Sequence, residues 1–151
     1  MGVFVGIDVS LENCAVCAVD EHGKLVKETK VASDPGALDA CIRGIPGVVE
    51  AIGIEAGPLS QWLHKSLTDF GLPVVLMETR QVKAALKAAP VKTDRRDAAG
   101  LARLLQMGWF RPVHCKSLSA QELRVLLGAR RSVQDAAINI EMSIRGMLRN
   151  F

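Results

Sequence analysis

Residues 3–8 read Val-Phe-Val-Gly-Ile-Asp, an apolar run that is typical of a buried β-strand and that ends in a carboxylate. The same pattern returns at residues 51–55, which read Ala-Ile-Gly-Ile-Glu. In open sheets with parallel strands, ligands bind beyond the carboxyl ends of the strands. If these two strands are neighbours, Asp8 and Glu55 lie together at one edge of the sheet.

The chain around these two strands predicts an α/β fold with a mixed sheet of five strands. The first three strands should form an antiparallel meander, because His22 and Gly23 are typical of a tight hairpin turn. The other two strands follow helices, and such crossovers lay them parallel to the first strand. The strands are expected at residues 3–9, 13–20, 24–31, 48–55 and 72–77. The helices are expected from Asp34-Pro35 to Ile42, from Pro58 to Phe70, over 78–86, from Thr93 or Asp94 to Met107, and over roughly 30 residues after the start signal at Ser119.

The 151 residues suffice for one hydrophobic core, and we expect a catalytic domain at residues 1–111 and a connector with a long helix at residues 112–151. The pattern Ser119-Ala120-Gln121-Glu122 is that of a capping box at the start of this helix. Apolar and small residues then alternate three and four apart, at Leu126, Ala129, Val133, Ala136, Ile140, Ser143 and Met147. This weak heptad seam predicts a coiled coil or docking on another subunit, and so a homo-oligomer. The alternative is a helix that lies on its own domain with a frayed end.

No run approaches the roughly 18 apolar residues that a membrane span needs, and the chain enters a strand without a signal sequence. We therefore expect a cytoplasmic protein without a membrane partner. The four cysteines lack ligand spacing, since Cys14 and Cys17 are three apart on a strand and point to opposite faces. They are expected to be reduced and structural. His64 and His114 show no ligand spacing either.

Charge is divided unevenly along the chain. The net charge is +3, but residues 1–79 carry 5 Lys/Arg against 11 Asp/Glu, whereas residues 80–151 carry 14 against 5. A basic second half beside an acidic cluster indicates a surface for a polyanion next to a metal site, because Lys and Arg supply phosphate contacts. The alternative is an ordinary solvated helix surface.

Two further carboxylates, Asp94 and Asp97, are three residues apart at the start of a predicted helix and therefore share one of its faces. The same face continues through Leu101 and Leu104, so it should be turned toward the sheet. Each acid also has a structural alternative, since Asp94 could be the N-cap and Asp97 a first-turn acid favoured by the helix dipole. Asp8 could end its strand in a turn.

Converging carboxylates are the ligands that hard divalent cations prefer. We therefore predict a site for one or two magnesium ions, with manganese as a substitute, held by Asp8, Glu55, Asp94 and Asp97. The scissile phosphate would complete the coordination. Basic residues placed to meet phosphates are Lys92, Arg95, Arg96, Arg103 and Arg111, although these are also ordinary helix-surface charges.

Three segments, in this order, resemble the DEDD transposases of the insertion-sequence 110 family: Gly6-Ile7-Asp8-Val9-Ser10, Ile54-Glu55-Ala56-Gly57 and Lys92-Thr93-Asp94-Arg95-Arg96-Asp97-Ala98. The resemblance covers nearly the whole chain, and its third segment is the most specific. It implies a ribonuclease-H-like fold similar to the Holliday-junction resolvase RuvC. It also implies that Asp8, Glu55, Asp94 and Asp97 are the catalytic acids.

The function implied by this resemblance is DNA recombination, in which a mobile element is excised and inserted with magnesium at the acidic site. A structured bridge RNA from the element would guide the reaction. Members of the family continue into a carboxy-terminal domain with a serine nucleophile, which these 151 residues do not supply. We therefore expect a fragment that is not fully active by itself but that can still bind metal and nucleic acid.

Two other functions are compatible with parts of the sequence. An ATPase of the actin and sugar-kinase type can open with a similar Gly-x-Asp strand, but it predicts a duplicated second half and glycine-rich phosphate loops that the sequence lacks. A non-catalytic module that binds RNA or joins subunits through the long helix is the other alternative.

Overall fold

The computed structural model describes residues 1–87 and 93–149, apart from the side chain of Asp94. In this part of the chain the strands are β1 Gly2–Asp8, β2 Asn13–Asp20, β3 Leu25–Ala32, β4 Val48–Glu55 and β5 Val74–Met77. The helices are α1 Pro35–Arg43, α2 Ser60–Asp69, α3 Thr79–Leu86, α4 Asp94–Gln106 and α5 Leu118–Leu148. Residues 88–92, between α3 and α4, lie outside the described residues.

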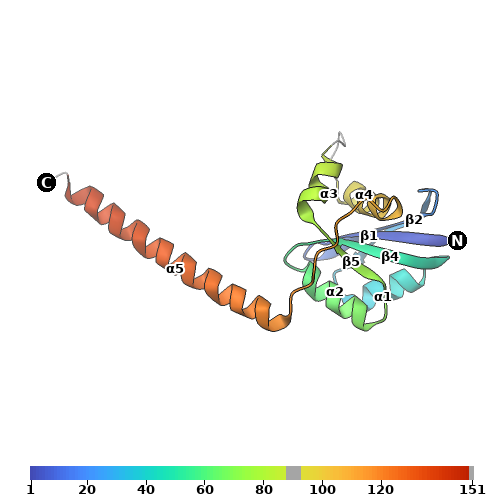
Figure 1. The fold of residues 1–151 in the computed structure, drawn as a ribbon, viewed down its shortest axis with the longest axis horizontal. Coiled ribbons are helices and arrows are strands. Elements are labelled where there is room, and N and C mark those ends of the chain that lie inside the picture. The colour runs from blue at the N-terminus through green and yellow to red at the C-terminus, as the bar shows by residue number, and fades with distance from the viewer. Residues whose placement is uncertain (88–92, 150–151) are drawn as a thin grey trace. The chain divides into compact units, whose positions relative to one another are not determined.

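The strands form one mixed sheet in the order β3-β2-β1-β4-β5 (Figure 1). The first three pair antiparallel, and β4 and β5 continue the sheet in parallel with β1. Between β2 and β3, the carboxylate of Asp20 accepts hydrogen bonds from the backbone N–H groups of His22 and Lys24, both at 2.9 Å. This confirms the predicted α/β class and five-stranded mixed sheet, and it makes β1 and β4 neighbours.

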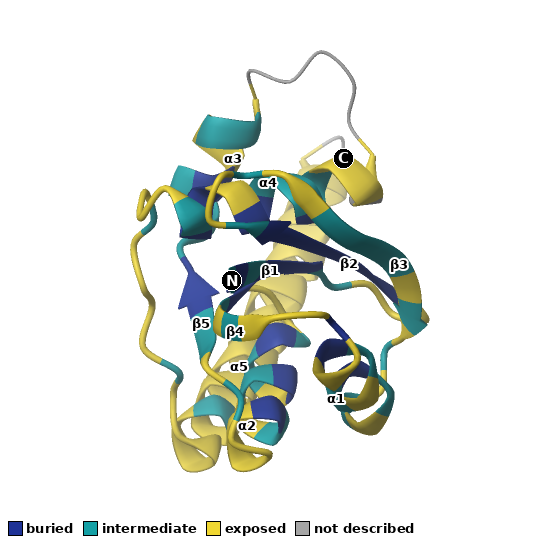
Figure 2. Cartoon of the chain, turned by 90° about the vertical axis from the view of Figure 1, so that its right-hand side faces the viewer, coloured by how far each residue is buried: buried dark blue, intermediate teal, exposed yellow. Residues whose placement is uncertain are grey.

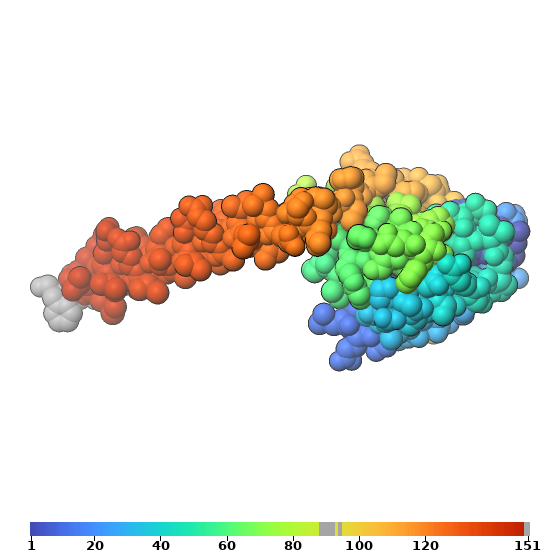
Figure 3. Space-filling view, turned by 90° about the horizontal axis from the view of Figure 1, so that it is seen from below, coloured from blue at the N-terminus to red at the C-terminus, as the bar shows by residue number. Residues whose placement is uncertain are grey.

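Helices cover both faces of the sheet. On one face, side chains of β1 and β4 such as Val5 and Ile52 pack against α1 and α2, which Figure 3 shows side by side in cyan and green. On the other face, α4 packs on β1 and β2 through Ala98 and Ala102. Buried residues gather in the sheet and on the sides of the helices turned toward it (Figure 2). The candidate functional site lies on the α4 face.

Some predicted details differ from the structure. Helix α2 buries Ser60, Leu63 and Leu67, whereas two large apolar residues of the expected helix, Trp62 and Phe70, are about half exposed, at 50% and 46%. Helix α5 begins after Ser117, whose hydroxyl accepts a hydrogen bond from the Ala120 N–H at 3.3 Å, and not at the predicted capping box. The serine nearer the connector therefore caps the helix.

The contacts divide the chain into two units, with the boundary between Cys115 and Lys116. In the first unit, the segment after α4 runs along β5, because Glu78 N–H donates to the Arg111 carbonyl and Val113 N–H to the Leu76 carbonyl. The second unit contains α5, which buries none of its residues. Among the described residues, no helix has both the length and the apolar composition that a membrane span requires.

Candidate functional site

Asp8 and Glu55 end adjacent parallel strands at the same edge of the sheet. Ile7 pairs with Ile54 in the ladder between β1 and β4, and each acid is the next residue of its strand. Ile7 and Ile54 are buried in the core beneath α1 and α2. Because successive side chains of a strand alternate between the two faces, Asp8 and Glu55 both belong to the α4 face. The predicted proximity of these two acids therefore depends on the register in which β1 and β4 pair.

Helix α4 lies directly on this face because two glycines leave room for it. A Cβ added to Gly6 would lie 2.1 Å from the Ala98 carbonyl oxygen, and one added to Gly53 would lie 2.8 Å from a methyl carbon of Leu105. Both distances are below ordinary contact. A side chain at Gly6 would meet backbone atoms and push the helix away, whereas at Gly53 the ends of the Met77 and Leu105 side chains would have to shift. The glycines of both strand runs thus permit the close approach of α4 to the sheet.

The direction of α4 brings its amino-terminal end toward the two acids. Its carboxyl end lies at the β2–β3 hairpin, where Gln106 Nε2 donates to the Glu21 carbonyl at 2.9 Å. Its middle lies over Gly6, two residues before Asp8. Asp97 is half-buried and stands one turn before Leu101, which also packs against Gly6. Asp97 is therefore on the side of the helix that faces the sheet, near the edge where β1 ends.

Asp94 is the first residue of α4, but its side chain lies outside the described residues. The alternative that Asp94 caps the helix is wrong, because Thr93 is the N-cap and its hydroxyl accepts the Arg96 N–H at 3.3 Å.

Asp8 and Glu55 line one open cleft of about 610 Å³. Two loops, which follow β1 and β4, and one side of α3 form its walls. The lining residues are Asp8, Val9, Ser10, Leu11, Glu55, Ala56, Gly57, Pro58, Leu59, Ser60, Thr79 and Lys83. The loop after β4 is held by buried Ser60, whose hydroxyl lies 2.7 Å from both the N–H and the carbonyl of Gly57. Thr79 adds a hydrogen bond to the Ala56 carbonyl at 2.7 Å.

The donor chemistry of this cleft fits a magnesium ion, since both converging groups are carboxylates. Among the side chains that the structure describes, no three of the types His, Cys, Asp and Glu are grouped closely enough to hold a metal ion. Magnesium sites in proteins commonly use only one or two carboxylates together with waters and substrate phosphates. Asp8 and Glu55 can supply that number. The thiols are unsuited to this role, and burial raises the pKa of Cys17 on the α4 face.

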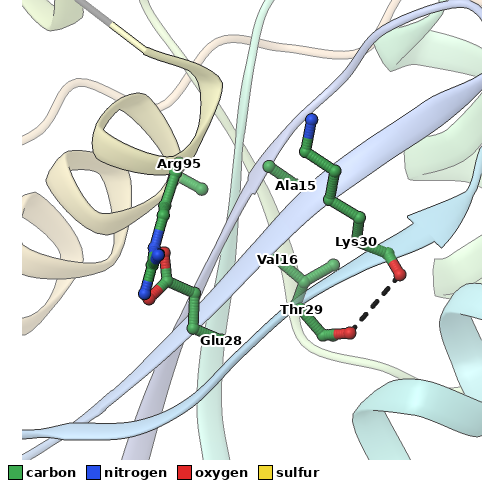
Figure 4. A pocket seen from close by; sticks show the side chains of 7 residues that line it. Ala15, Val16, Glu28, Thr29, Lys30 and Arg95 are labelled. Atoms are coloured by element: carbon green, nitrogen blue, oxygen red, sulfur yellow. Dashed lines mark hydrogen bonds and ion pairs between the residues drawn. The ribbon is translucent and has the colours of Figure 1, made fainter.

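The predicted phosphate-binding residues occupy several places. Lys92 lies outside the described residues. Arg95 reaches away from the acidic edge, across a second cavity of about 290 Å³, and pairs with Glu28 of β3 (Figure 4). The hydrogen bond to Glu28, with the attraction between the two charges, raises the pKa of the Arg95 guanidinium. Arg96 is exposed in the first turn of α4.

The other two predicted arginines, Arg103 and Arg111, lie on different segments of the chain. Arg103 is exposed on α4, on the side near Cys17 of β2. Arg111 lies beyond α4 at the edge of β5, where its guanidinium is 4.0 Å from the Glu78 carboxylate. The two arginines are separated because α4 ends at Gln106 and the chain turns at Gly108 before it reaches Arg111.

The sequence did not indicate Lys83 and Thr79 as site residues, although they line the cleft together with the two acids. They stand one turn apart on α3 and are therefore on one side of the helix. An exposed lysine on an amphipathic helix gives no signal by itself, because only the packing of α3 beside the strand ends puts it near Glu55.

Comparisons with known proteins agree with this geometry. The family model of the DEDD transposases of insertion sequence 110, described as "Transposase", matches residues 5–151. The transposase for insertion sequence element IS1111A of Coxiella burnetii is 26% identical over 153 residues, which cover 97% of this chain and 39% of the relative. The chain thus spans about two fifths of the length of this curated relative.

Solved structures show the same fold. RuvC of Thermus thermophilus in complex with a Holliday junction substrate is similar with a TM-score of 0.52 at 20% identity, covering 75% of this chain and 100% of that chain. A second Thermus thermophilus RuvC structure gives a TM-score of 0.51 at 21% identity, covering 74% and 99%. The fold is therefore RuvC-like, within the ribonuclease-H-like class. With the family model matched from residue 5 to the end, the chain belongs to the DEDD transposase family of insertion sequence 110.

Proposed function

We propose that this chain is the metal-dependent DNA-cleaving domain of a transposase that excises and inserts a mobile element. The observation that carries the proposal is the meeting of Asp8 and Glu55 in one cleft at the ends of neighbouring parallel strands. Asp97 and the backbone position of Asp94 at the start of α4, which packs on the same face, support a role for all four acids. Family membership favours this function over the sugar-kinase type of ATPase.

The residues of the cleft suit the cleavage of a phosphodiester. Magnesium bound there would supply a Lewis acid for the phosphate and would lower the pKa of a bound water. The chain's own contribution is to hold carboxylate oxygens at fixed positions, since Asp8 and Glu55 belong to strands and the loop after Glu55 is tied by buried Ser60 and by Thr79. Rigid elements position such a site more precisely than loops do.

Complete strand exchange would require more than these residues. The family resemblance implies a carboxy-terminal domain with a serine nucleophile and a structured guide RNA. Support for nucleic-acid partners comes from the 14 Lys/Arg among residues 80–151 and from the RuvC relative, which is bound to a Holliday junction. We propose that Lys92, Arg96 and Arg103 contact phosphates, and that Arg95 and Arg111 do so after release from their carboxylate partners.

The long helix α5 supports a second role as a docking element. It buries none of its residues, and several large apolar side chains of the predicted seam are well exposed. These include Leu126 at 67%, Val133 at 70%, Ile140 at 62% and Met147 at 59%. An exposed apolar seam of this length is stabilised when it packs against another helix. We propose that a second copy of the chain supplies that helix and forms a homodimer.

Manganese binding tests the metal site. Electron paramagnetic resonance should show saturable Mn²⁺ binding to the chain mixed with a DNA duplex, because substrate phosphates complete such sites. Asp8→Asn and Glu55→Gln should each weaken Mn²⁺ binding by at least about tenfold. Glu50→Gln is the matched control, since Glu50 is an exposed glutamate on the same strand as Glu55 and outside the cleft. Equal binding in all variants, or no saturable binding in the wild type, would refute the proposal.

A further inference from the structure

The cleft that holds Asp8 and Glu55 contains one cation among its described lining residues, the ammonium of Lys83. The rest of the lining is neutral apart from the two acids. A phosphodiester that approaches this cleft meets two negative charges, and without an opposing positive charge their repulsion disfavours its binding. Lys83 is placed to supply that charge from the α3 wall.

The position of Lys83 is fixed by the packing of α3. The adjacent Val82 is buried at 1% exposure, and Leu86 presses so closely on α4 that a Cβ on Gly100 would lie 2.1 Å from one of its methyl carbons. Thr79, one turn before Lys83, is tied to the loop after β4. These contacts hold α3 on two sides. The side of the helix that carries Thr79 and Lys83 therefore remains directed to the cleft.

Several other cations of the first unit are paired with carboxylates, whereas Lys83 has no such ion pair among the described residues. Lys65 pairs with Asp69 at 2.6 Å, and Arg95 pairs with Glu28. Within the described part of the chain, no carboxylate lies within 4.0 Å of the Lys83 ammonium, and Glu55 likewise has no ion pair. Lys83 therefore shares a cleft with two acids without being neutralised by direct contact with Glu55. Its charge remains available to a ligand.

We infer that Lys83 contacts the phosphate of the DNA strand that enters this cleft, next to the carboxylates. This inference rests on the proposed function and names a residue of the same site. The ammonium donates hydrogen bonds to non-bridging phosphate oxygens and offsets the charge of Asp8 and Glu55 while the strand enters. Its role is to bind the phosphate at the acids, and the acids hold the metal.

A purely structural role for Lys83 predicts different behaviour. Lys83 stands in the last turn of α3, where a cation interacts favourably with the helix dipole. Lys87, the C-cap of the same helix, shares that environment but does not line the cleft. Both lysines are exposed, so neither substitution should unfold the protein. Lys87→Gln is therefore a matched control that separates phosphate contact from support of the helix.

The experiment measures binding of the chain to a fluorescent DNA duplex by anisotropy at several salt concentrations without divalent metal. Lys83→Gln should weaken binding about five- to twentyfold and reduce the salt slope by about 1, as expected for the loss of one phosphate contact. Lys83→Arg should retain most of the affinity and the slope. Lys87→Gln should change the affinity by less than about twofold, since an exposed charge outside the cleft contributes little.

The outcomes separate this inference from the proposed function. If Lys83→Gln and Lys87→Gln bind DNA equally well with the same salt slope, Lys83 does not contact phosphate, whatever the manganese measurement shows. If both lysine variants lose affinity equally, the effect is general charge and the inference is again wrong. If Mn²⁺ binding fails in the wild type while Lys83→Gln alone loses DNA affinity and salt slope, the phosphate contact stands and the metal site does not.

Discussion

Gly6 and Ala98 touch where β1 passes beneath α4, and a Cβ on Gly6 would lie 2.1 Å from the Ala98 carbonyl oxygen. This contact connects the first acidic motif of the sequence with the third. It sets the distance between the strand that ends in Asp8 and the helix that carries Asp97. The geometry of the candidate site therefore depends on a residue that has no side chain.

Gly6→Ala should destabilise the first unit, because the new methyl group meets backbone atoms that cannot rotate away. We expect a loss of about 1–3 kcal/mol in the free energy of unfolding, measured by urea denaturation. Gly57→Ala serves as a control, since the added Cβ would lie 3.9 Å from the Glu55 carbonyl oxygen, which is an ordinary contact distance. A Gly6→Ala protein as stable as the wild type would show that α4 can shift on the sheet.

Asp97→Asn should separate catalysis from binding. The substitution keeps the size of the side chain but removes the charge that a metal ligand needs, so the DNA cleavage that we propose should fall by at least about a hundredfold. Binding of RNA, measured by filter retention, should remain within about threefold, because a neutral side chain does not repel phosphates. Loss of both activities together would indicate that Asp97 stabilises the fold instead.

Glu28→Gln should strengthen nucleic-acid binding. In the pair with Glu28, the Arg95 side chain is 73% exposed. Loss of the pair should therefore lower the free energy of unfolding by less than about 1 kcal/mol. The released guanidinium can then contact a phosphate, and DNA affinity at low salt should rise about two- to fivefold. Glu12→Gln removes one exposed negative charge elsewhere and serves as the control. An equal gain in both variants would assign the effect to net charge alone.

The hairpin between β2 and β3 should make stability depend on pH through Asp20. Hydrogen bonds from the Lys24 and His22 backbone N–H groups, with the Lys24 bond the larger cause, lower the pKa of this carboxyl. Because the folded pKa lies below the unfolded one, the stabilisation is complete above about pH 4 and is lost as the pH falls through the folded value. Asp20→Asn should lower the thermal midpoint at pH 7 and converge with the wild type near pH 2. Equal differences at both pH values would contradict this.

Replacing Ile140 with Asp should weaken association through α5. A charge placed in an apolar helix seam is unfavourable when two helices pack, so the dimer dissociation constant should rise at least about tenfold, as measured by sedimentation equilibrium. Gln134→Asp adds the same charge outside the seam and should leave association within about threefold. A wild-type chain that remains monomeric at high concentration would contradict the proposed homodimer, and α5 would then serve a different partner.

The places of the acids at the ends of strands and at the start of a helix were largely predictable because each motif carries local signals. An apolar run followed by Asp8 or Glu55 identifies a strand and its end, and Asp94 and Asp97 share a helix face by their spacing. Whether the strands pair was not local information. It was confirmed by the register in which Ile7 faces Ile54, while the metal-binding role of the four acids stays a prediction.

Other features were beyond the sequence because they depend on where a helix is placed. Lys83 looks like any exposed lysine until α3 packs beside the loop after β4. Arg95 was expected near phosphates. In the structure, Glu28 of β3 lies within reach of Arg95 and pairs with it. The sequence predicted the start of α5 at Ser119, but Ser117 is the N-cap of this helix. Two serines two residues apart give equivalent signals for a helix start, and only the backbone geometry decides which of them caps the helix.

The sequence by itself determined the order of strands and helices, the acids that end two of those strands, and the family to which the chain belongs. These follow from periodicity, turn residues and short motifs, which act over a few residues. Only the tertiary structure decided that Asp8 and Glu55 share a cleft, that Gly6 lets α4 lie on β1, and that Lys83 lines the same cleft. The reason is physical: these relations arise when the apolar faces of distant segments are buried together, and no local pattern specifies that packing.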